Sequence, residues 1–163
     1  MENITLKFTG AIVLSIVIAF ALSLLPLREE WGLLRPEWIA LTLVHWALYA
    51  PKKASLLVAW IAGLFVDALH GSILGQHAFG FSMLMLMTLR LRSRILVDSL
   101  LHQFFVLFLV LGTYLLVNLW VLGFTGNSPA GWGYWFTVVT SLIVWPFYNY
   151  FLKIFHAKKK PFQ

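Results

Sequence analysis

Residues 99–152, SLLHQFFVLFLVLGTYLLVNLWVLGFTGNSPAGWGYWFTVVTSLIVWPFYNYFL, contain no Asp, Glu, Lys or Arg. A bilayer core about 30 Å thick needs about 17–25 apolar residues per helix, so this segment is too long for one membrane crossing. The glycine-containing stretch 123–133, GFTGNSPAGWG, supplies a loop near its middle. We therefore expect two membrane-spanning helices here, over residues 100–122 and 134–152.

The composition of the whole chain agrees with a membrane protein. Hydrophobic residues make up 61% of the sequence and charged residues only 11%, whereas soluble domains contain about 25% charged residues. So few charges cannot cover a water-exposed surface. The net charge of +6 comes from basic residues in short clusters between apolar runs. This pattern favours a role in membrane orientation and gives no sign of nucleic-acid binding.

Four further helices are predicted upstream, over residues 8–25, 36–50, 54–70 and 77–89. Pro26 ends the first, and Pro36 suits the first position of the second. The Pro51-Lys52-Lys53 sequence separates the second from the third, because two lysines at mid-bilayer would cost about 5–7 kcal/mol. The basic cluster 90–94 ends the fourth. The prediction is one all-α domain over residues 1–163, a six-helix transmembrane bundle with a basic tail at 153–163.

The first apolar run has an alternative interpretation as a secretory signal. Its Ala19-Phe20-Ala21 sequence has the small-residue spacing of a cleavage site. However, the apolar run continues beyond this point, and Lys7 supplies its only positive charge. We therefore expect a retained helix.

The basic residues predict the orientation. With six spans, ten of the twelve Lys and Arg residues fall on one side of the membrane. By the positive-inside rule, this side is the cytoplasm and holds both termini. The ten are Lys7, Lys52, Lys53, Arg90, Arg92, Arg94, Lys153, Lys158, Lys159 and Lys160, and the other two are Arg28 and Arg35.

The most informative segment for function is 63–75, GLFVDALHGSILG. Gly63, Asp67, Gly71 and Gly75 recur every four residues, and small residues at this spacing let helices approach closely. Asp67 lies about 21 Å along a helix from Lys53, inside the outer third of the bilayer. An aspartate at such depth is costly and is expected to have a partner in the protein.

Three roles for Asp67 remain open. It can form a helix-packing or partner-binding centre, it can cap the turn at Gly71, or it can serve as a proton or ion site. A hydrogen bond from His70, three residues further along, is the expected contact of its side chain.

Enzymatic chemistry is not predicted. The sequence has no nucleophile elbow, phosphate-binding glycine loop or paired carboxylates. Its five histidines lack the spacing of a zinc site, and cysteine is absent. We expect no metal and no cofactor. The basic clusters at 90–94 and 158–160 can attract anionic lipid or an acidic protein, although a topological role suffices to explain them.

With these features, the chain resembles the MreD family of bacterial rod shape-determining membrane proteins. The matching features are Arg35-Pro36 before a short helix, Trp46 just before Pro51, and the block from Gly63 through Asp67 to Gly75. The resemblance covers essentially the whole chain and is most specific between about residues 35 and 80. It implies a multi-pass protein of the bacterial inner membrane that takes part in cell elongation.

The resemblance also implies partners. MreD-like proteins associate with MreC, and they are linked to the MreB cytoskeleton and to the peptidoglycan synthase formed by RodA and its transpeptidase partner. Their fold is similar to that of the substrate-binding subunits of energy-coupling-factor transporters. On this chain, Gly63, Asp67, His70, Gly71 and Gly75 would form the core of partner binding or helix packing. Arg35 and Trp46 are weaker candidates, since an interfacial anchor explains both.

Three functional classes follow from these observations. A non-enzymatic assembly subunit is the leading interpretation. A substrate-binding subunit of a small-molecule, vitamin-like transporter is the alternative, and an intramembrane enzyme has the least support because no catalytic set is present.

Overall fold

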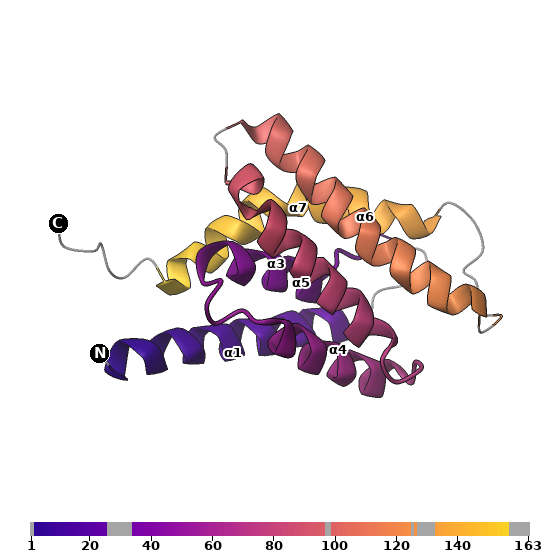
Figure 1. Cartoon of the computed structure of the whole chain (residues 1–163), viewed down its shortest axis with the longest axis horizontal. Helices are drawn as coiled ribbons and strands as arrows, with labels where there is room; N and C mark the ends of the chain where they lie inside the picture. Colours follow the sequence, from indigo (N-terminus) through magenta and orange to yellow (C-terminus); the bar gives the residue numbers. More distant parts are fainter. Residues whose placement is uncertain (1, 26–33, 97–98, 125, 127–132, 157–163) are drawn as a thin grey trace.

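The computed structural model describes residues 2–25, 34–96, 99–124, 126 and 133–156. Within these ranges the protein is all-α and contains six helices (Figure 1). They are α1 (Glu2–Leu24), α3 (Trp38–Tyr49), α4 (Leu56–His70), α5 (Gln76–Ile95), α6 (Leu100–Phe124) and α7 (Gly133–His156). The described part thus agrees with the expected all-helical fold.

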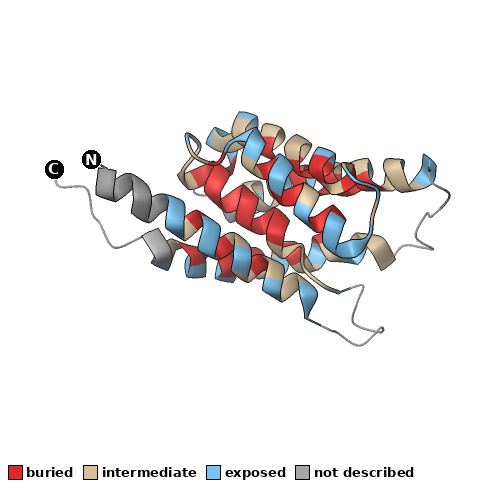
Figure 2. Ribbon diagram, turned by 90° about the horizontal axis from the view of Figure 1, so that it is seen from below, coloured by how far each residue is buried: buried red, intermediate tan, exposed pale blue. Residues whose placement is uncertain are grey.

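The short helix α3 lies at the centre of the bundle and packs against α1, α5 and α7. Every residue of α3 from Ile39 to Leu48 is buried, which explains why the sequence of this helix is apolar on all sides. The α4–α5 hairpin and the α5–α6 pair complete the packing. Buried residues follow the inward sides of the helices, and exposed residues lie on the outer surface (Figure 2).

Helix α5 departs from the prediction at its C-terminal end. We expected Arg90, Arg92 and Arg94 to stop the helix at Leu89, but it continues to Ile95. Arginine is a good helix former, so charge alone does not end a helix. Arg92 also donates a hydrogen bond from Nε to the carbonyl of Leu48 at 2.7 Å. This contact joins the end of α5 to the end of α3.

One helix in the described part is long and apolar enough to cross a membrane, over residues Leu101–Phe124. The apolar helices Thr9–Leu24, Trp38–Tyr49 and Leu56–His70 are shorter than 18 residues. At 1.5 Å per residue, the 12 residues of α3 extend about 18 Å. The predicted six complete crossings are therefore not established by helix length.

The two ends of the molecule differ in charge. Besides the Arg92 contact with α3, Lys153 of α7 lies with Nζ 5.2 Å from the centre of the Tyr49 ring, at the C-terminal end of α3. The start of α1 and the end of α7 lie at the same end of the molecule (Figure 1). At the other end, Arg35 donates hydrogen bonds from Nη1 and Nη2 to the carbonyls of Ser23 and Leu25, at the C-terminal end of α1.

Candidate functional site at the α4–α5 turn

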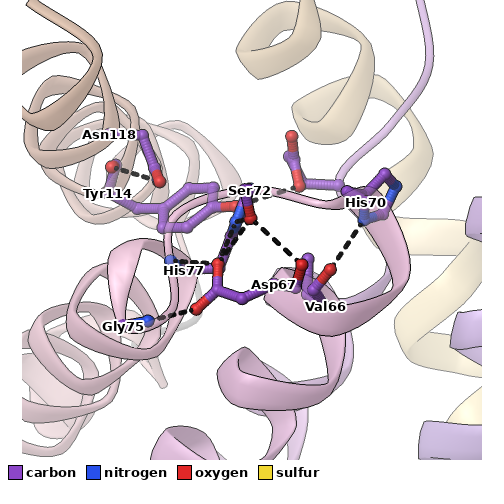
Figure 3. A network of polar contacts seen from close by, with 9 residues as sticks. Val66, Asp67, His70, Ser72, Gly75, His77, Tyr114 and Asn118 are labelled. Atoms are coloured by element: carbon purple, nitrogen blue, oxygen red, sulfur yellow. Dashed lines mark hydrogen bonds and ion pairs between the residues drawn. The ribbon is translucent and has the colours of Figure 1, made fainter. Parts of the chain in front are cut away.

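Asp67 organises the turn between α4 and α5 (Figure 3). Its Oδ1 accepts hydrogen bonds from Ser72 Oγ at 2.8 Å, the His77 backbone N–H at 3.0 Å and His77 Nδ1 at 2.8 Å. Its Oδ2 accepts one from the Gly75 N–H at 2.8 Å. The residue is 1% exposed. Both carboxylate oxygens are therefore occupied by donors from the segment that follows α4.

Two glycines give this segment its path. Gly71 has φ 63° and Gly75 has φ 102°, both in the region that side chains with a Cβ rarely adopt. Gly71 ends α4, and Ser72 N–H bonds back to the carbonyl of Asp67 at 3.1 Å, as helix C-termini with a left-handed residue commonly do. The chain then returns so that the first turn of α5 presents its N–H groups to Asp67.

Gly63 has a different role from Gly71 and Gly75. A Cβ added at Gly63 would lie 2.2 Å from Cα of Ala78 in α5, a distance that no real contact allows. At Gly71 and Gly75 an added Cβ would meet nothing within 4 Å. Gly71 and Gly75 thus shape the turn between the two helices expected over residues 54–70 and 77–89. Gly63 alone among the three permits close helix packing.

The expected hydrogen bond between His70 and Asp67 is wrong. Nδ1 of His70 contacts the carbonyl of Val66 in its own helix, at 3.0 Å. His77 takes the predicted place, because the turn folds it back onto Asp67. A turn bounded by Gly71 and Gly75 brings the first residues of α5 near the end of α4, and this turn is the signal in the sequence that points to His77.

Trp46 and Arg35 lie apart from Asp67. Trp46 is 1% exposed, and its Nε1 donates to Ser15 Oγ of α1 at 2.7 Å. It therefore packs α3 against α1, and the interpretation as an interfacial anchor is wrong. Arg35 holds the C-terminal end of α1 through the two carbonyl contacts described above. Nδ1 of His45 in α3 lies 2.7 Å from Oδ1 of Asn149 in α7.

A polar cavity of about 160 Å³ lies beside the turn. Its wall includes residues from α1, from the segment before α3 and from α4 to α7. They are Ser23, Arg35, Pro36, Glu37, Ile39, Val66, His70, His77, Phe81, Tyr114 and Thr137. The cavity thus brings Arg35 and His70, which the sequence singled out, into one place.

Glu37 is the cavity residue that sequence reasoning missed. It precedes α3, its backbone N–H donates to Ser141 Oγ at 2.9 Å, and its Oε2 lies 3.5 Å from the Tyr114 hydroxyl. The sequence does not reveal that Tyr114, 77 residues further along the chain, packs against Glu37.

The geometry at Asp67 favours turn capping among the three roles left open. A carboxylate that already accepts four hydrogen bonds is stabilised without an ion. In the described part of the chain, no three His, Cys, Asp or Glu residues gather in a way that suits a metal ion. The ionisable side chains that could contact a ligand in this region are those of the cavity wall.

Comparison with known proteins agrees with the resemblance seen in the sequence. The model of the family described as "rod shape-determining protein MreD" matches residues 5–155. The rod shape-determining protein MreD of Haemophilus influenzae is 41% identical over 66 residues, a match that covers 40% of this chain and 41% of that protein. The chain is thus aligned with about two fifths of that relative's length. No solved structure matches. Because the family model covers nearly the entire sequence, the chain belongs to the MreD family of rod shape-determining proteins.

Proposed function

We propose that this protein is a non-enzymatic, multi-pass membrane subunit of the bacterial cell-elongation machinery that binds MreC and helps organise peptidoglycan synthesis. The match to the MreD family carries this proposal. RodA, its transpeptidase partner and, indirectly, MreB are the other components that it would join. The protein would lie in the inner membrane with both termini in the cytoplasm.

The distribution of polar and apolar side chains supports the membrane location. Large apolar side chains on α6 are widely exposed, among them Leu101 at 83%, Trp120 at 64% and Phe124 at 76%. The interior in contrast contains polar residues, including Thr42, Asn118 and Ser141. A water-soluble monomer rarely exposes large contiguous apolar patches, whereas lipid solvates such a surface.

The charges at the two ends support the orientation. Arg92 and Lys153 approach the same end of α3, and Lys52 and Lys53 follow α3 directly. Arg35 lies at the opposite end. By the positive-inside rule, the end with these four cations faces the cytoplasm.

The α4–α5 turn supports a role in partner binding through its rigidity. Because Asp67 and Gly63 are buried, neither residue can touch a partner directly. They hold the outward residues Leu69, His70 and Ile73, which are exposed. We expect MreC to recognise the surface that this turn presents.

Copurification with MreC tests the proposal. Asp67→Leu and Gly63→Ile should each reduce the recovered MreC and round the cells, because each deforms the turn. Leu69→Ser should reduce MreC recovery without lowering the thermal stability of the purified protein. Gly112→Ala is the control, since a Cβ there would meet nothing within 4 Å. Normal rods and unchanged complexes for all three test variants would refute the role of the turn.

The transporter alternative gains little from the cavity. Sites for drug-sized ligands, such as a vitamin, usually occupy about 300–1,000 Å³, and this cavity measures about 160 Å³. The predicted likeness to substrate-binding subunits of energy-coupling-factor transporters remains a prediction. A stoichiometric vitamin-like molecule that copurifies with the protein would favour that alternative.

A further inference from the structure

Two histidines, His70 and His77, line the cavity beside the turn. Their hydrogen bonds determine which ring nitrogen of each carries the proton. Nδ1 of His77 faces a carboxylate oxygen and Nδ1 of His70 faces a carbonyl oxygen. Since these oxygens only accept, both Nδ1 atoms carry the proton in the neutral rings, and Nε2 of each ring is an acceptor. The two rings stack with centres 6.1 Å apart.

Glu37 adds a carboxylate to these acceptors. Its Oε2 lies 3.5 Å from the Tyr114 hydroxyl, and the residue lines the cavity. The three acceptor groups come from different elements, and all belong to the wall of one cavity. Such a wall suits a ligand that donates several hydrogen bonds and carries positive charge.

One donor in the same wall lacks an acceptor. The two terminal nitrogens of Arg35 bond to carbonyls at the end of α1. Its Nε is buried and has no partner within the described residues. The guanidinium lines the cavity, so its positive charge would stabilise an anionic oxygen bound there. The cavity therefore combines a set of acceptors with the positive charge of an arginine.

We infer that this cavity binds a compact zwitterion, with a primary ammonium held by Glu37 and the two histidines and an anionic oxo group held by Arg35. The volume of about 160 Å³ corresponds to about five water molecules at about 30 Å³ each, which accommodates a phosphoethanolamine group or a small amino acid. This inference goes beyond the proposed function and does not depend on which protein binds the turn.

The primary ammonium is the decisive feature of the ligand. A trimethylammonium group has the same charge but no N–H donors, so it cannot satisfy three acceptors. The donor could belong to the headgroup of phosphatidylethanolamine or to a free zwitterion such as glycine. Both sources share the same chemistry, and the experiment below separates them.

The test uses the full-length protein, stripped of lipid in detergent, and native mass spectrometry. Phosphatidylethanolamine and phosphatidylcholine with the same acyl chains are titrated separately, as are free phosphoethanolamine and glycine. We expect phosphatidylethanolamine to bind at least tenfold more tightly than phosphatidylcholine. Competition by free phosphoethanolamine at the same stoichiometry would assign the site to the lipid headgroup. Tight binding of glycine without preference between the lipids would assign it to a free zwitterion.

Glu37→Gln keeps the shape of the side chain and removes its charge. We expect it to weaken binding of the preferred ligand about tenfold, the usual effect of losing one charge-assisted hydrogen bond. Arg90→Gln, at the opposite end of α5, is the matched control and should bind like wild type. Equal binding of both lipids together with no binding of either free zwitterion overturns the inference. So does equal affinity of the Glu37 and Arg90 variants. The comparison of ligands on the wild-type protein decides the question even if Glu37→Gln fails to fold.

Discussion

Asp67 acts inside the protein, where its carboxylate supplies the hydrogen-bond acceptors that the N–H groups at the start of α5 would otherwise lack. The first N–H groups of a helix have no partner within the helix. Here Asp67 Oδ1 accepts from the N–H of His77 and Oδ2 from that of Gly75. The carboxylate thereby caps α5 from the preceding helix, which ties the two helices of the hairpin together.

A graded series of substitutions checks this capping role. Ser72→Ala removes one of four donors and should destabilise the protein by about 1 kcal/mol. Asp67→Asn places an amide N–H₂ against at least one donor and should cost about 1–3 kcal/mol. Asp67→Leu leaves every donor without its acceptor and should cost the most. Thermal unfolding in one detergent measures the order, and a leucine variant as stable as wild type would contradict it.

The sequence predicted that Asp67 needs a partner within the protein, because the depth of a residue in a bilayer follows from counting along a helix. It could not identify His77 in place of His70. The choice depends on the path of the turn, which two glycines with positive φ determine. Glu37 was missed for a similar reason, because its neighbour Tyr114 is 77 residues away in the chain.

At the scale of elements, the α4–α5 hairpin depends on the close approach of Gly63 in α4 to the backbone of Ala78 in α5. Gly63→Ala puts a methyl group where the backbone of Ala78 lies, so the two helices must separate. Overpacking of this kind typically costs about 1–3 kcal/mol. Gly112→Ala, within α6, should be neutral or slightly stabilising, since alanine favours helices over glycine. Unfolding in detergent compares the two, and equal midpoints would show that the hairpin relaxes without cost.

Apolar runs and prolines predicted the positions of the helices well, because these signals depend only on residues close together in the chain. The end of α5 was harder to predict, since Arg92 is stabilised by the carbonyl of Leu48 in another helix. The burial of Trp46 was missed for the same physical reason. Its hydrogen-bond partner, Ser15, comes from α1, and no local pattern reveals such a contact.

At the scale of the whole molecule, the apolar outer surface, the buried polar residues and the basic end suit a protein dissolved in lipid. The complete absence of cysteine allows a direct test of this arrangement. Any introduced cysteine is unique, and the wild-type protein is its own blank. Lys52, Ile73 and Ser93 are exposed, so each can be replaced by cysteine without disturbing the core.

We expect a membrane-impermeant maleimide to label Ile73→Cys in intact spheroplasts, because Ile73 lies at the end opposite the basic cluster. Lys52→Cys and Ser93→Cys should react only after the membrane is opened. Labelling of Ile73→Cys and Lys52→Cys to the same extent from outside would contradict the proposed orientation. The cavity shares its end of the molecule with Ile73, since His70 and His77 lie on either side of this residue. The labelling result therefore also determines from which leaflet a phosphatidylethanolamine headgroup would reach the cavity. Labelling of Ile73→Cys from outside would assign it to the outer leaflet.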